Sequence, residues 1–215
     1  MEAKNNLEKL VGLFTEFSGV SYSTDVIDSI HKEVPLYDNT LKSIEQFIPY
    51  IEKVGEKLQD TVTAQNLIEN FQERLDIIVH KLKFIRKENR NKVLLLQNTS
   101  PISSEQDSYL ENLITLSGGV PIQLDSDNFH PDIILIVSSE PMGEILQNLP
   151  NVFTSGDWKS YNAVRNNQIF IIQKPEYLRS GGAYIPEDAE ILAEIINPGY
   201  FIYGRDEDVW MNFSF

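Results

Sequence analysis

The 215-residue sequence contains no cysteine. This absence excludes structural disulfides, cysteine-ligated zinc, a cysteine nucleophile and a lipidated N-terminal cysteine. Histidine is scarce as well. His31, His80 and His130 lie far apart and none has a second ligand at metal spacing, which favours structural or surface roles. The sequence also lacks a G-x-S-x-G elbow, a P-loop and a G-x-G-x-x-G turn, so we expect neither an enzyme nor a required cofactor.

Basic residues are few in this sequence. Eighteen Lys and Arg residues stand against 32 Asp and Glu residues, and the resulting net charge of −14 disfavours binding to nucleic acids and anionic lipids. We expect the excess negative charge to serve solubility, although docking on a basic partner is an alternative. No apolar run is long enough for a membrane span or a signal peptide, so we expect no membrane insertion. The sequence as given predicts a cytoplasmic protein, or a periplasmic one if a leader has been removed.

Residues 1–62 predict a small N-terminal lobe, either α/β or helical. Apolar residues at helical spacing predict a first helix that ends at Ser18: Leu7, Leu10, Val11, Phe14 and Phe17. Short strands are expected at 20–22 and 34–37. A further helix is expected from Leu41, capped by the polar residues 38–40.

A long helix that connects two lobes is predicted at residues 63–90. Neither Gly nor Pro interrupts 63–89, and apolar residues recur every three or four positions: Leu67, Ile68, Phe71, Leu75, Ile78, Val79, Leu82 and Ile85. Such a helix would span roughly 40 Å at about 1.5 Å per residue and could act as a rigid spine. A coiled-coil arm is the alternative, but the apolar stripe is wide and lasts few heptads.

Residues 91–215 predict an α/β lobe with a parallel sheet, because short apolar runs alternate with helical segments. Continuous apolar runs at 92–97 and 133–137 are typical of strands buried on both faces. Further strands are expected at 120–123 and 168–172, and helices at 104–116, 142–149 and 186–197. The aromatic C-terminal tail is expected to pack back on this lobe, with an oligomer or partner contact as the alternative.

One loop in this lobe carries the most informative chemistry. In Arg179-Ser180-Gly181-Gly182, two glycines permit positive φ and a close approach to a ligand, beside a guanidinium that could meet an anion. A plain strand-to-helix loop is the alternative. The acidic clusters Asp125/Asp127 and 206–208 lack the glycine and ligand spacing of a calcium loop, which favours solvated turns.

Four sequence runs occur in a fixed order within the predicted α/β lobe. They are PDIILI at 131–136, Trp158 followed by YNAVRNNQIF at 161–170, YLRSGG at 177–182, and EILAEIINP at 190–198. In this order they resemble the C-terminal lobe of the cobalamin- and iron-siderophore-binding proteins of ABC importers, the class with a helical backbone. SGG at 117–119 resembles the AGG turn of that family, and residues 40–74 resemble its entry into the connecting helix.

The resemblance implies two α/β lobes joined by a rigid helix, with a small-molecule ligand clasped between them. That ligand would be a corrinoid, a heme or an iron chelate, bound as cargo. The resemblance places these residues in or beside the ligand site: Thr99, Pro101, Ile102, Trp158, Tyr177, Arg179, Gly181 and Gly182. An arginine could donate to ligand amides or carboxylates, and an aromatic ring could pack against a corrin or chelate edge.

The sequence departs from that family in three places. Only residues 1–38 precede the helix entry, so the N-terminal lobe is reduced, and a second copy in a homodimer could supply the missing side of the site. Residues 124–130 stand where the family has a helix with a docking glutamate, which leaves docking on an ABC permease doubtful. Ser180 and Gly182 stand where the family has prolines. The alternative function is a non-transport interaction or oligomerising module that kept the lobe fold and lost the ligand site.

Overall fold

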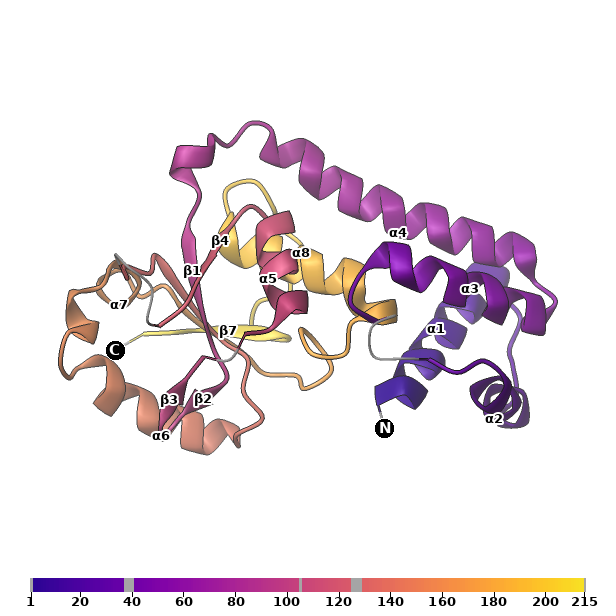
Figure 1. Cartoon of the computed structure of the whole chain (residues 1–215), viewed down its shortest axis with the longest axis horizontal. Coiled ribbons are helices and arrows are strands. Elements are labelled where there is room, and N and C mark those ends of the chain that lie inside the picture. Colours follow the sequence, from indigo (N-terminus) through magenta and orange to yellow (C-terminus); the bar gives the residue numbers. More distant parts are fainter. Residues whose placement is uncertain (1, 37–40, 105, 125–128, 215) are drawn as a thin grey trace. The chain divides into compact units, whose positions relative to one another are not determined.

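The computed structural model describes residues 2–36, 41–104, 106–124 and 129–214. The chain forms two compact units (Figure 1): unit 1 contains residues 1–77 and 180–188, and unit 2 contains residues 78–179 and 189–215. The segment expected to connect two lobes, 63–90, therefore contributes its first part to unit 1 and its second part to unit 2.

Unit 1 is helical in the part of the chain that the structure describes. It contains α1 (Glu2–Ser18), α2 (Thr24–Glu33), α3 (Ile44–Leu58) and most of α4 (Thr61–Leu82). The apolar stripes of these helices supply a set of buried side chains: Leu7, Leu10, Phe14, Phe47, Ile51, Val54, Leu67 and Phe71. Burying one such side chain contributes roughly 1.5–3 kcal/mol, so this core is the main source of stability for the unit.

The strands predicted at 20–22 and 34–37 are wrong for the residues that the structure describes. Residues 20–22 and 34–36 form no strand, and the Val20 side chain is 51% exposed. A short apolar run becomes a stable strand only where other strands complete its hydrogen bonds, and the helices of unit 1 provide none. The cap expected at 38–40 lies outside the described residues, whereas Ser43 caps α3 by accepting a hydrogen bond from the Gln46 amide at 3.3 Å.

The long helix predicted before the α/β lobe exists but is shorter than expected. α4 has 22 residues and ends at Leu82, which gives about 33 Å at 1.5 Å per residue. Beyond Leu82 the chain tightens into 3₁₀-type turns, in which the Phe84 amide donates to Lys81 O at 3.2 Å and the Ile85 amide to Leu82 O at 3.0 Å. Apolar residues three positions apart fit both conformations, so their spacing could not mark the end of the helix.

Unit 2 contains a five-stranded sheet in the order β4-β1-β5-β6-β7. β1 (Lys92–Leu96), β4 (Val120–Ile122), β5 (Ile133–Ile136) and β6 (Ile169–Ile172) are parallel, and β7 (Trp210–Phe213) runs antiparallel to β6. Every residue of β5 and β6 is buried, as continuous apolar runs predict for strands covered on both faces. The expected α/β class with a parallel sheet is confirmed.

Helices cover both faces of this sheet (Figure 1). α6 (Met142–Phe153) and α7 (Asn162–Arg165) pack on the face that carries Leu94, Ile134 and Ile169. α5 (Ser108–Leu116) and the end of α8 (Ile185–Ile196) meet the opposite face at Gly119, where an added Cβ would lie 2.9 Å from Ile114, 3.0 Å from Val93 and 3.2 Å from Ile196. Gly119 thus allows β4 to begin directly against both helices.

The aromatic tail packs back on unit 2, as expected. β7 pairs with β6 from Ile169↔Phe213 to Ile172↔Trp210, and the side chains of Phe201 and Val209 are fully buried. Tyr200 and Ile202, by contrast, remain 48% and 87% exposed. The tail therefore completes one edge of the sheet while leaving two apolar side chains on the surface.

Candidate ligand-binding site

The topology of unit 2 marks one position on its sheet as a candidate site. From β1 the chain crosses to β4 on one side, and then returns to β5 and β6 on the other side of β1. The carboxyl ends of β1 and β5 therefore lie at the point where the strand order reverses, which is where open α/β sheets bind ligands. Residues 97–103 follow β1 at this edge, and residues 137–141 follow β5.

A polar cluster occupies this position. The Glu140 carboxylate accepts hydrogen bonds from the Thr99 amide at 2.9 Å, from Thr99 Oγ1 at 2.8 Å and from Ser138 Oγ at 3.1 Å. Asn148, on α6, donates to Thr99 Oγ1 at 3.2 Å. Partial burial alone would raise the pKa of Glu140, but the hydrogen bonds from Thr99 and Ser138 outweigh it and lower the pKa below its ordinary value. Glu140 is therefore ionised at neutral pH.

Arg179 brings a positive charge to the same edge. One of its Nη atoms donates to the Ser138 carbonyl oxygen, which ties the loop after β6 to the loop after β5. The side chain is half-buried, and burial lowers the pKa of its guanidinium, although Glu176 opposes the shift. A guanidinium carries five N–H donors, and no second hydrogen-bond partner lies in the described part of the chain, so Arg179 can still donate to a ligand.

Three further predicted residues lie on the loops of this edge. Tyr177 is half-buried and stands two residues before Arg179. Pro101 and Ile102 belong to the hairpin of β2 (Asn98–Thr99) and β3 (Ile102–Ser103), where Pro101 is exposed and Ile102 packs against the core. The predicted loops after β1 and β6 therefore both lie at the carboxyl ends of the parallel strands.

Trp158 lies elsewhere. Its ring packs edge-on against Phe129, Phe153 and Tyr161, with centroids 6.0, 5.2 and 5.8 Å away. Phe129 precedes β5 and Phe153 ends α6, so this aromatic cluster lies at the amino end of the strands. The structure therefore does not bring Trp158 together with Thr99 and Arg179.

The two glycines of the predicted loop approach the protein's own chain. Gly181 and Gly182 have φ values of 57° and 58°, and both are buried in unit 1. An added Cβ on Gly181 would overlap the Leu41 carbonyl oxygen, and one on Gly182 would overlap Asn6 Oδ1. The buried Asn6 amide also bridges the loop, since it donates to Ser180 O at 3.0 Å and accepts from the Ala183 amide at 2.8 Å. Internal packing thus explains both glycines.

Ser138 and Glu140 were not predicted from the sequence. A signal for them exists, because polar residues 138–140 directly follow the apolar run of β5. Metal ligation has no such support: among the described residues, no group of three His, Cys, Asp or Glu side chains could hold a metal ion. Asp125 and Asp127 lie outside the described residues, and Asp208 pairs with Lys174 at 2.6 Å.

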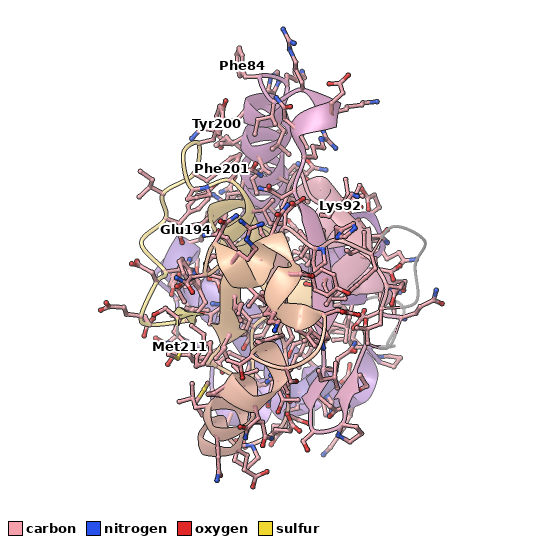
Figure 2. The ribbon with its side chains drawn as sticks, turned by 90° about the vertical axis from the view of Figure 1, so that its left-hand side faces the viewer. Phe84, Lys92, Glu194, Tyr200, Phe201 and Met211 are labelled. Atoms are coloured by element: carbon pink, nitrogen blue, oxygen red, sulfur yellow. The ribbon has the colours of Figure 1, made fainter. Side chains whose placement is uncertain are left out.

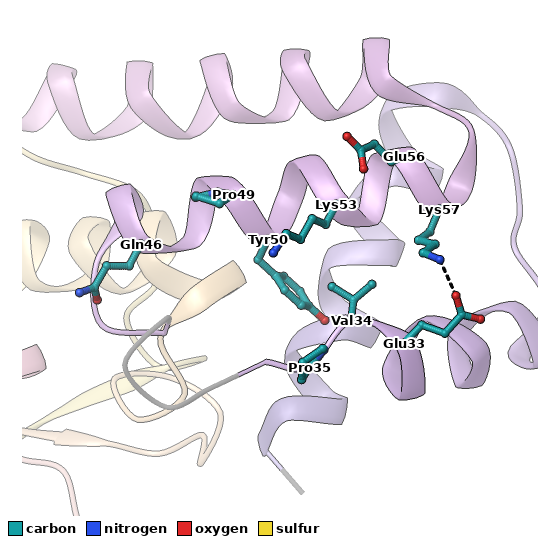
Figure 3. A pocket seen from close by; sticks show the side chains of 9 residues that line it. All are labelled: Glu33, Val34, Pro35, Gln46, Pro49, Tyr50, Lys53, Glu56 and Lys57. Carbon is teal, nitrogen blue, oxygen red and sulfur yellow. Dashed lines mark hydrogen bonds and ion pairs between the residues drawn. The ribbon is translucent and has the colours of Figure 1, made fainter.

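Unit 1 has a concave surface of its own, with a volume of about 520 Å³ between α2 and α3 (Figure 3). Two acidic and two basic side chains line it, Glu33, Glu56, Lys53 and Lys57, so their charges balance, and Glu33 pairs with Lys57. Tyr50 lines it with a buried hydroxyl that has no partner among the described residues, and burial raises the pKa of Tyr50 to about 12. This surface offers less directed chemistry than the sheet edge of unit 2.

Several solved structures have a fold similar to that of this chain. An ABC transporter substrate-binding protein from Listeria monocytogenes EGD-e has a TM-score of 0.58 and 19% identity, and the match covers 74% of this chain and 66% of that one. The chain has the fold of ABC-transporter substrate-binding proteins. IsdE from S. aureus, solved with heme, matches with a TM-score of 0.57 and 18% identity over 82% of this chain and 75% of its own. Ceue from Helicobacter pylori, solved with Ni(II), matches with a TM-score of 0.53 and 21% identity over 74% and 53%.

The substrate-binding-protein fold rests on structure alone, since no protein-family model and no curated protein matches the sequence. The chain spans 53–75% of the length of these three structures. Of the three, the Listeria protein is a substrate-binding protein, and the other two were solved with heme and with Ni(II). In the described residues, no helix is both long and apolar enough to cross a membrane.

Proposed function

We propose that this chain is a binding protein for a corrinoid, heme or iron-chelate ligand, which it holds at the carboxyl edge of the unit 2 sheet. The observation that carries the proposal is the pairing of Thr99 with Glu140 and of Arg179 with Ser138 at the strand-order reversal. Proteins of the same fold are solved with heme and with Ni(II), which supports a metal-containing ligand.

The charges at the edge suit a ligand that carries both acidic and amide groups. Arg179 can donate to a propionate, carboxylate or hydroxamate oxygen, and charge-assisted hydrogen bonds of this kind are the strong ones. Glu140, held ionised by Thr99 and Ser138, can accept from ligand amide N–H groups. The half-buried Tyr177 ring can pack against the flat edge of a macrocycle.

The protein contributes no metal ligand in this proposal. The metal arrives inside its chelate, so the side chains recognise the periphery of the ligand and leave its coordination unchanged. A homodimer is the proposed source of further contacts, because a ligand of this size is bound well only when most of its surface is covered.

The test is a titration of the purified chain with hemin, cobinamide, cobalamin and ferric citrate, followed by absorbance and by melting temperature. A ligand at a hundredfold excess over its Kd should stabilise the protein by about 2.7 kcal/mol. For a chain of this size, that free energy raises the Tm by roughly 5–11 °C. Arg179→Gln should weaken binding about 10–100-fold, because it removes a charged hydrogen-bond donor.

Arg165→Gln is the matched control, because Arg165 is exposed on α7 and the change removes the same charge. Equal losses in the two variants would attribute the effect to overall charge and contradict the site. If none of the four ligands changes the absorbance or the Tm, the ligand-binding proposal fails. The alternative, an interaction module that kept the lobe fold, then gains support from the packing of Gly181 and Gly182 against Leu41 and Asn6 within unit 1.

A further inference from the structure

Positive charges are concentrated in one short segment of this acidic chain. Of the 18 Lys and Arg residues, a third lie between positions 81 and 92: Lys81, Lys83, Arg86, Lys87, Arg90 and Lys92. Glu88 is the one acidic residue in that segment. We call these six cations the basic surface. Its local charge is opposite to the net charge of −14 carried by the whole chain.

Four of the six cations, Lys83, Arg86, Lys87 and Arg90, line a concavity with an apolar floor. The concavity has a volume of about 520 Å³ and lies in unit 2, where the end of α4 and the following turn meet the end of α5. Leu82, Ile85 and Leu116 are among its apolar lining residues, and none of the described lining residues is acidic. The Nε atom of Arg90 is buried there and has no hydrogen-bond partner in the described part of the chain. A buried donor without a partner favours an anion close to it.

Exposed apolar side chains flank the cations. Phe84 is 80% exposed, and Ile202 is 87% exposed on the segment that follows α8. The two segments are neighbours in unit 2, because Lys81 Nζ donates to Tyr200 O at 3.1 Å and lies 5.2 Å from the centre of the Phe201 ring. Figure 2 shows Phe84, Tyr200 and Phe201 following one another at the same side of unit 2.

We propose that the basic surface docks peripherally on an anionic phospholipid bilayer. Lysine and arginine side chains are attracted to anionic headgroups, and clusters of four to eight of them are typical of lipid-binding segments. Phe84 and Ile202 would enter the boundary between headgroups and acyl chains, where exposed apolar side chains are stabilised. Arg90, which lines the concavity beside these cations, would add the positive charge of its guanidinium to the headgroup contact.

A lipid surface explains the combination better than an acidic protein partner. Phe84 and Ile202 are 80% and 87% exposed and stand on two separate segments, whereas the core of a protein–protein interface gathers its apolar side chains in one patch. A fluid headgroup layer can receive isolated apolar side chains and long flexible cations without a complementary shape. No described helix is long and apolar enough to cross a membrane, so the attachment is a surface contact.

The test is co-sedimentation of the full chain with vesicles of phosphatidylcholine alone and with vesicles containing one third phosphatidylglycerol. Binding should require the anionic lipid and should weaken as salt rises. Lys83, Arg86 and Lys87 changed together to Gln should lower the affinity about 100-fold, because each cation contributes about fivefold. Phe84→Ala should lower the affinity for anionic vesicles by up to about tenfold, and this loss should not depend on the salt concentration.

Matched controls separate the surface from general effects. Changing Lys32, Lys53 and Lys159 to Gln removes the same charge from exposed positions elsewhere, and Val62→Ala trims a side chain that is 72% exposed. Both controls should bind vesicles as the wild type does. All variants should give the same result as the wild type when titrated with hemin. This comparison separates membrane docking from the ligand site.

Three results would overturn the proposal. Equal binding to both vesicle types, or none to either, would exclude an anionic bilayer. Binding to soluble polyglutamate as tight as that to anionic vesicles, with no effect of Phe84→Ala, would identify an acidic protein surface as the partner. Retained vesicle binding in the triple Gln variant would show that the basic surface is not the contact.

Discussion

Replacing Gly181 by alanine would add a methyl group where unit 1 has no room. Gly181 has φ 57° and ψ −151°, a backbone region that only glycine adopts freely, and holding any other residue there costs about 1–3 kcal/mol. The new Cβ would also overlap the Leu41 carbonyl oxygen, and a backbone atom cannot rotate away as a side chain can. Overpacking of this kind costs typically 1–3 kcal/mol. We expect a total loss of about 2–6 kcal/mol.

Chemical denaturation of the Gly181→Ala and Gly204→Ala variants separates the cost of backbone strain from the cost of the steric overlap. Gly204 also has a positive φ, 72°, but nothing lies within 4 Å of its ideal Cβ, so it reports backbone strain without a clash. Gly143, in α6 with open space around it, serves as a second control, and its change to alanine should stabilise by roughly 0.5–1 kcal/mol. If Gly181→Ala loses no more stability than Gly204→Ala, then Leu41 does not fill the position, and a ligand role for this glycine returns.

Three further predictions concern single buried polar groups. Tyr50→Phe should raise the free energy of unfolding by about 1–3 kcal/mol in urea denaturation, because it removes a buried hydroxyl without a partner; a loss of stability would show that the hydroxyl is bonded. Asn6→Ala should cost at least about 1–3 kcal/mol by the same measurement, because it leaves the Ala183 amide buried without its acceptor, and a neutral result would contradict the bridge. The pKa of Glu140 is lowered in the folded protein, so its stabilising effect is fully present above the ordinary value of 4.5 and is lost as pH falls through the lower folded value. The stability difference between wild type and Glu140→Gln should therefore be constant from pH 7 to 5 and shrink in more acidic buffer; a constant difference down to pH 3 would refute the assignment.

The sheet of unit 2 was predictable because its strands carry their signal locally. β1, β5 and β6 are continuous apolar runs, and only burial on both faces makes such runs stable. The start of α5 was less well marked: Ser104 and Asp107 are both good caps, and the structure uses Asp107, whose carboxylate accepts from the Tyr109 amide at 3.0 Å. Capping preference alone does not show which of the two residues begins the helix, because the packing of the following turn decides where it starts.

The candidate site was predictable only in part, because its pairs are distant in sequence. Thr99 and Arg179 were named from the resemblance. Glu140 follows the apolar run of β5, but that position does not show that it binds Thr99, 41 positions away. The glycines illustrate a second limit. A Gly-Gly pair shows that something approaches the backbone closely, but the sequence does not say whether a ligand or the protein's own Leu41 is the neighbour.

The bond between Asn6 and Ala183 has a consequence for biosynthesis. The two residues are 177 positions apart, yet both belong to unit 1, which also requires residues 180–188. At a ribosomal rate of about 5–20 residues per second, the N-terminal helices wait roughly 9–35 s for the segment that completes their core. Residues 78–179, the larger part of unit 2, are synthesised in that interval. Unit 1 therefore emerges from the ribosome first but cannot finish folding until residues 180–188 are made, and its apolar stripes stay exposed on the nascent chain during that time, where chaperones can protect them.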